Sequence, residues 1–186
     1  MAHGDCRSTI AWSRRSALAG AAAALLAGSA RSGAQAPLTT SAIDVHHHFL
    51  PPFYKPLVKG WLDSFATNVD AVMAWTPEAS LTAMAKARVE RAILSVSAPG
   101  VHFGDAVQAR SVARQCNDYA ANLVRAHPGR FGFFAALPMP DVESAIHEAE
   151  RAMALDGVHG VGLLSNYAGR YLGDPEFRPL FAWLAR

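Results

Sequence analysis

Strand-like and helix-like segments alternate four times after residue 40, and this alternation limits the fold more than any other feature of the sequence. The segments expected to be strands are rich in apolar residues and span 41–49, 91–97, 131–137 and 157–164. Those expected to be helices span 76–89, 105–127, 141–155 and 174–186. Such alternation predicts an α/β fold of parallel strands covered by helices, either an open sheet or a barrel. No glycine-rich phosphate loop follows a strand, which argues against a nucleotide-binding sheet.

Local signals fix several boundaries of these segments. Pro51 and Pro52 end the first strand, and 51–75 is expected to be a loop region. Thr76 before Pro77 is typical of a helix start. Apolar residues recur at helical spacing within 105–127 and give one apolar face. Cys116 lies on that face, so it is interpreted as a core residue rather than a nucleophile.

Residues 1–36 have the order of a secretory signal peptide. Arg14 and Arg15 directly precede an apolar stretch of Ala, Leu and Gly, and Ala34-Gln35-Ala36 supplies small residues for cleavage. The arginine pair indicates the bacterial Tat route, so we expect a periplasmic or secreted protein. The domain itself is then expected to span 37–186.

The net charge of the domain limits its partners. Removing residues 1–36 takes Lys plus Arg from 17 to 13 and Asp plus Glu from 15 to 14, so the remainder has a net charge of −1. A nearly neutral body argues against nucleic acid as a partner. Outside the signal segment no apolar run is long enough to suggest a membrane span.

The residues that carry chemistry are concentrated at the end of the first predicted strand. Alternation along this strand places Asp44, His46 and His48 on one face and Val45 and His47 on the other. Two imidazoles at positions i and i+2 can bind one divalent ion, so His46 and His48 are candidate metal ligands. Asp44 is suited to hydrogen bonding that supports such ligands.

Weaker candidates lie in the segments that follow other strands. Ser97 and His102 follow the second strand and Asn166 follows the fourth, where each could contact a substrate or simply cap the local chain. No Ser–His–Asp arrangement has support in the local sequence.

Residues 43–51, Ile-Asp-Val-His-His-His-Phe-Leu-Pro, resemble the first strand of the amidohydrolase superfamily, whose members are metal-dependent (β/α)₈ TIM barrels. The closer resemblance is to the branch of aminocarboxymuconate-semialdehyde decarboxylase-like proteins. Further similar stretches span 95–101, 113–118, 128–132, 136–141 and 171–175.

This resemblance implies the N-terminal half of such a barrel, about four βα units, in which His46 and His48 bind a divalent metal, usually zinc. The family takes further ligands from later strands, a His after the fifth and an Asp after the eighth, so we expect a truncated chain that is not a competent enzyme by itself. The implied activity is decarboxylation of a small conjugated or aromatic carboxylic acid. The alternatives are hydrolysis of an amide, ester or lactone, and a non-catalytic remnant or homo-oligomeric half-barrel.

Overall fold

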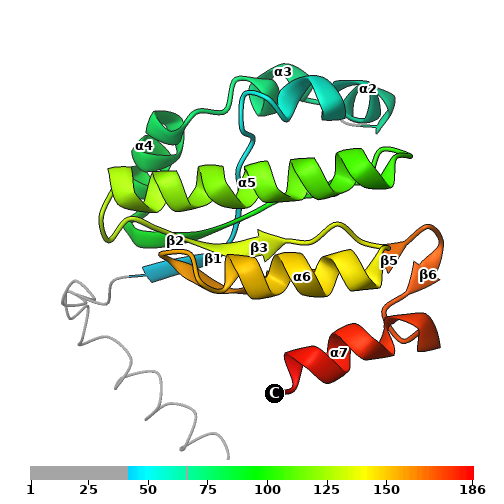
Figure 1. Cartoon of the computed structure of the whole chain (residues 1–186). Coiled ribbons are helices and arrows are strands. Elements are labelled where there is room, and N and C mark those ends of the chain that lie inside the picture. The colour runs from blue at the N-terminus through cyan, green and yellow to red at the C-terminus, as the bar shows by residue number, and fades with distance from the viewer. Residues whose placement is uncertain (1–41, 66) are drawn as a thin grey trace, which may run out of the picture. The chain divides into compact units, whose positions relative to one another are not determined.

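Four parallel strands form one sheet, in the order β1-β2-β3-β4, in this computed structural model (Figure 1). The structure describes residues 42–65 and 67–186, so the expected signal peptide lies outside the described residues. The strands are β1 (Ala42–His48), β2 (Val89–Ser95), β3 (Phe131–Ala136) and β4 (Val158–Gly162). Strands adjacent in sequence are adjacent in the sheet, which confirms the predicted parallel α/β arrangement.

Capping residues begin three of the four helices that the sequence predicts. The four are α4 (Pro77–Ala87), α5 (Ala106–Ala126), α6 (Val142–Ala152) and α7 (Arg178–Leu184), the last preceded by the 3₁₀ turn η1 (Pro175–Phe177). The side chains of Thr76, Asp105 and Asp141 accept hydrogen bonds from backbone N–H groups in the first turns of α4, α5 and α6. The predicted starts of these three helices are therefore confirmed, whereas the last α-helix begins at Arg178, after η1, and not at 174. The predicted ends run too far: α6 stops at Ala152 and α7 at Leu184.

The expected loop at 51–75 is wrong, because two helices occupy most of it. These are α2 (Lys55–Phe65) and α3 (Val69–Met73). The carbonyl of Pro51 accepts the N–H groups of Tyr54 and Lys55, which forms a turn directly before α2. Pro56 lies in the first helical turn, where a missing N–H costs nothing. The prolines therefore lead into a helix instead of preventing one.

A short hairpin also follows β4 that the sequence did not predict. Its strands are β5 (Asn166–Tyr167) and β6 (Arg170–Tyr171), which pair antiparallel. Ala168 and Gly169 connect them with positive φ angles of 50° and 79°, as a tight turn requires. The fourth strand accordingly ends at Gly162, before the expected residue 164.

The core lies where α5 packs against β3. Cys116 and Phe133 are fully buried there, which confirms Cys116 as a core residue. Asn117, next along α5, is buried as well; its amide donates to the carbonyl of Ala136 and to Glu148 on α6, and its oxygen accepts the N–H of Ala136. Among the described residues, no helix combines the length and apolarity needed to cross a membrane.

Candidate functional site

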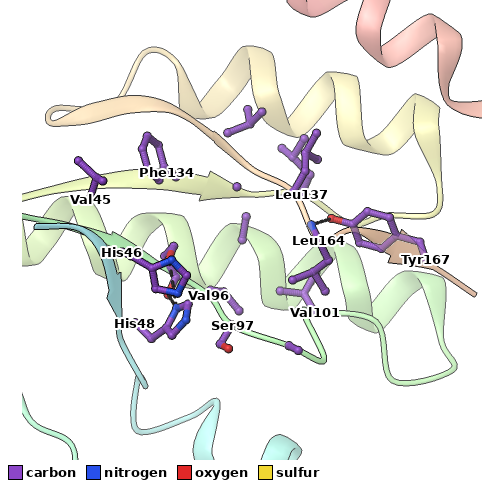
Figure 2. Close-up of a pocket in the computed structure, with 17 residues that line it drawn as sticks. Val45, His46, His48, Val96, Ser97, Val101, Phe134, Leu137, Leu164 and Tyr167 are labelled. Carbon is purple, nitrogen blue, oxygen red and sulfur yellow. Dashed lines mark hydrogen bonds between the residues drawn. The ribbon is translucent and has the colours of Figure 1, made fainter. Parts of the chain in front are cut away.

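A hollow of about 460 Å³ extends across all four strands of the sheet near their carboxyl ends (Figure 2). Parallel strands bring these ends to one edge, which is where sites form in α/β folds. The polar side chains that line the hollow are those of His46, His48, Ser95, Ser97 and Tyr167. Its apolar lining includes Val45, Phe134, Leu137, Val161 and Leu164. The hollow therefore combines a few polar groups with mainly apolar walls, as ligand sites usually do.

His46 and His48 project together from β1 into this hollow, as Figure 2 shows. Their ring centroids lie 4.7 Å apart, with the ring planes 70° from each other. The structure thus brings together the two residues that the sequence singled out. Their role as metal ligands stays a prediction, which this placement supports.

Strict alternation along β1 is wrong for Asp44. From Asp44 to His47 the strand advances three residues, whereas its partner β2 advances only from Ala92 to Leu94. This one-residue shift is a β-bulge. Residues before a bulge and residues after it no longer follow one alternation between the two faces of the sheet. Asp44 therefore lies with His47, its hydrogen-bonding partner, and does not line the hollow with His46 and His48.

Ser95, which sequence reasoning missed, orients the imidazole of His48. The Nδ1 atom of His48 lies 3.4 Å from the carbonyl oxygen of Ser95 and 3.2 Å from its Oγ. Since a carbonyl only accepts, Nδ1 carries the proton and Nε2 keeps the lone pair that could bind a metal. Desolvation lowers the pKa of His48, and the neutral imidazole that results is the ligating form. The one available signal was that Ser95 ends the strand next to His48.

His47 lies on the other side of β1, as predicted, and it joins a hydrogen-bonded chain. Its Nδ1 lies 3.0 Å from Oδ2 of Asp44, and its Nε2 lies 2.9 Å from Oγ of Ser80 on α4. The indole N–H of Trp75 donates to the same Ser80 Oγ at 2.9 Å. The hydrogen bonds from His47 and from the N–H of His46 hold the pKa of Asp44 below its usual value, so this carboxyl is ionised.

This hydrogen-bonded chain contains a Ser–His–Asp arrangement that the local sequence did not indicate. Ser80 is 33 residues from His47 along the chain, and only tertiary folding brings them together. Ser80 is 4% exposed, and neither it nor His47 lines the hollow described above. A nucleophile must reach its substrate, and this serine does not.

The three predicted substrate-contacting residues are divided between two hollows. Ser97 lines the same hollow as the histidine pair. His102 and Asn166 line an adjoining hollow, which shares Leu164 and Tyr167 with the first. The Nδ1 of His102 accepts the N–H of Gly104, which is a local capping contact. Sequence position therefore placed Ser97 beside the histidines but not His102 or Asn166.

The donor set fits part of a divalent-metal site. Two imidazole nitrogens suit first-row metals such as zinc. Within residues 42–65 and 67–186, no group of three or more His, Cys, Asp or Glu residues is placed to hold an ion. A metal held by His46 and His48 would thus need its remaining ligands from other donors, including water.

Comparison with known proteins assigns the family. The amidohydrolase family profile matches residues 43–186. Decarboxylase yanB of Aspergillus niger is 40% identical over 159 residues, which cover 77% of this chain and 40% of that protein. The 6-methylsalicylic acid decarboxylase of Penicillium expansum is 35% identical over 155 residues, which cover 77% of this chain and 45% of that protein. The chain therefore spans less than half the length of these relatives.

A solved structure shares the same fold. Dihydroxybenzoic acid decarboxylase from Polaromonas sp. JS666, crystallised with manganese and the inhibitor 2-nitroresorcinol, superposes with a TM-score of 0.66 at 25% identity, covering 77% of this chain and 46% of that one. The sheet and its helices correspond to a partial (β/α)₈ barrel, which confirms the predicted fold class. The chain belongs to the amidohydrolase family, in the branch that contains these decarboxylases.

Proposed function

We propose that this chain forms the part of a metal-dependent decarboxylase that binds a small aromatic carboxylic acid. The observation that carries the proposal is the pair His46 and His48, which project together into a hollow at the carboxyl ends of four parallel strands. The relatives described above are named as decarboxylases, which favours loss of carbon dioxide over hydrolysis of an amide, ester or lactone.

The metal in this proposal is a divalent ion held by the Nε2 atom of His48 together with the imidazole of His46. When bound, such an ion supplies Lewis acidity to an oxygen of the substrate. The family resemblance favours zinc, while the Polaromonas structure contains manganese, so both ions enter the test.

The other residues of the hollow would orient the acid and exclude water. Phe134, Leu137 and Leu164 supply apolar walls against which an aromatic ring can pack. Burial raises the pKa of Tyr167, which keeps the phenol protonated. Its oxygen accepts the N–H of Leu164, so its O–H is still able to donate to a carboxylate or a ring hydroxyl. Ser97 offers a second hydroxyl in the same hollow.

The first experiment measures metal binding by three single variants. We expect His46→Ala and His48→Ala each to abolish retention of Mn²⁺ or Zn²⁺, measured by elemental analysis after dialysis against the ion. His147→Ala is the matched control, because this histidine is exposed on α6 and does not line the hollow. Equal loss in all three variants would contradict the assignment of His46 and His48 as the ligands.

The second experiment measures turnover. Catalytic zinc sites generally use three protein ligands. Two candidate ligands, His46 and His48, line the hollow, so we expect weak metal affinity and little activity from the 186-residue chain. This chain and a version extended through the downstream reading frame should be assayed with the same panel of hydroxybenzoic acids and lactones. Release of carbon dioxide by the extended version supports the proposal, and lactone opening alone would favour the hydrolase. Inactivity of both versions, with a defined oligomer on sedimentation, would favour a non-catalytic self-associating protein.

A further inference from the structure

A chain of hydrogen bonds links helix α4 to the metal-binding end of β1, although none of its side chains lines the hollow. We propose that Asp44, His47, Ser80 and Trp75 form a positioning relay that holds the bulge of β1 and thereby orients His46 and His48. The inference rests on the proposed function, in which these two histidines bind a divalent ion. The relay residues are positioning residues and touch neither the ion nor the substrate.

The direction of two of these hydrogen bonds follows from what each group can donate. The indole N–H of Trp75 only donates, so Oγ of Ser80 accepts it. The ionised carboxylate of Asp44 only accepts, so Nδ1 of His47 carries a proton and donates to it. Nε2 of His47 lies 2.9 Å from Oγ of Ser80, and this hydrogen bond joins the two halves of the relay. Each of these polar side-chain atoms therefore has a partner within the relay.

The relay acts on the bulge through Asp44. The extra residue in β1 lies between Asp44 and His47, where the ladder to β2 is interrupted. The two carboxylate oxygens of Asp44 span this interruption: Oδ1 accepts the N–H of His46 at 3.0 Å, and Oδ2 accepts the ring of His47. The side chain of Asp44 therefore fixes the backbone of His46, a candidate ligand. It also fixes the imidazole of His47, which anchors β1 to α4.

Burial favours positioning over nucleophilic catalysis for Ser80. Its side chain is among the few polar ones that are buried in the described part of the chain, and its oxygen is already engaged by Trp75 and His47. The other three relay residues are half-buried. Networks in which every polar group is hydrogen-bonded make a local structure rigid. Hydrogen-bonding partners that orient metal ligands typically change metal affinity by 10- to 100-fold.

The test compares Ser80→Ala with Thr76→Ala in the full chain. Both substitutions lie at the start of α4, and Thr76 caps this helix without joining the relay. We expect the Kd for Mn²⁺, measured by isothermal titration calorimetry, to rise about tenfold in Ser80→Ala and to stay within about twofold of wild type in Thr76→Ala. Trp75→Phe, which removes the N–H donor and part of the ring but keeps an aromatic side chain, should give a smaller increase. A Ser80→Ala variant that binds Mn²⁺ like wild type overturns the relay.

A metal-free readout separates failure of the relay from failure of the proposed function. In a ¹H–¹⁵N spectrum, Ser80→Ala should move the amide resonance of His46, whereas Thr76→Ala should leave it in place. If wild type binds no Mn²⁺ but this resonance moves, the proposed function fails and the positioning of His46 stands. An unmoved resonance overturns the relay whatever the metal result. Labelling of Ser80 by a fluorophosphonate in the folded chain would overturn it in favour of a nucleophile.

Discussion

Replacing Asn117 with alanine should destabilise the fold by about 4 kcal/mol. The Asn117 amide makes two hydrogen bonds with the backbone of Ala136, at 2.8 and 3.0 Å, and a third with Oε1 of Glu148 at 2.7 Å. Neutral hydrogen bonds contribute about 1 kcal/mol each and one to a charged group about 2 kcal/mol. Asn117 is 1% exposed, so water cannot replace these contacts without opening the core. Ala136 lines the hollow, so the loss also loosens the wall of the site.

Urea unfolding followed by circular dichroism measures this loss. The midpoint should fall while the slope of the free energy of unfolding against urea stays constant. Asn122→Ala is the matched control, because Asn122 lies on the same helix, is exposed and accepts a hydrogen bond from the exposed side chain of Arg125. We expect the control to change stability by less than about 0.5 kcal/mol. A loss below about 1 kcal/mol for Asn117→Ala would refute the reasoning that these contacts hold α5 to β3 and α6.

Three further predictions concern other parts of the chain. In a Cys6→Ser background, Cys116 should not react with Ellman's reagent at pH 8 until denaturant is added, because burial raises the pKa of its thiol to about 12. Hydrogen bonds from Ser144 in the first turn of α6 lower the pKa of Asp141 below 3.8. The contribution of Asp141 to the free energy of unfolding is therefore complete above that pH and is lost as the pH falls further. Asp141→Asn should make the free energy of unfolding less dependent on pH in this acid range. Finally, we propose export by the Tat route: replacing Arg14 and Arg15 with lysine should retain tagged protein in the cytoplasm, and unchanged export would remove that assignment.

Features that depend on neighbours in sequence could be predicted. The strand order follows from the regular alternation of strands and helices, and the caps at Thr76, Asp105 and Asp141 follow from single polar residues placed before helical patterns. The exposure of His46 and His48 to one hollow also follows from their i, i+2 spacing. In each case a local rule and the tertiary structure agree.

Features that depend on contacts between distant segments could not be predicted. The bulge in β1 is a mismatch with β2, and nothing within residues 42–48 reveals it. Ser80 appears in the sequence as an ordinary residue of a predicted helix, and its role depends on His47 of β1 and Trp75 lying against it. Helix α2 was missed because Pro51 and Pro52 were interpreted as breakers, although their turn leads directly into it.

The sheet order described above also sets where the backbone amides are protected from solvent. Within the described sheet, β2 and β3 have a hydrogen-bonded neighbour on each side, whereas β1 and β4 have one. Amide hydrogen exchange requires opening of those bonds, and strands with two partners open only in the largest unfolding events. Exchange should therefore be slowest in Val89–Ser95 and Phe131–Ala136 and faster in Ala42–His48. The histidine pair thus lies on a strand of low intrinsic protection, so its order depends on side-chain contacts: those of His48 with Ser95 on β2 and those of the neighbouring His47 with Ser80 on α4.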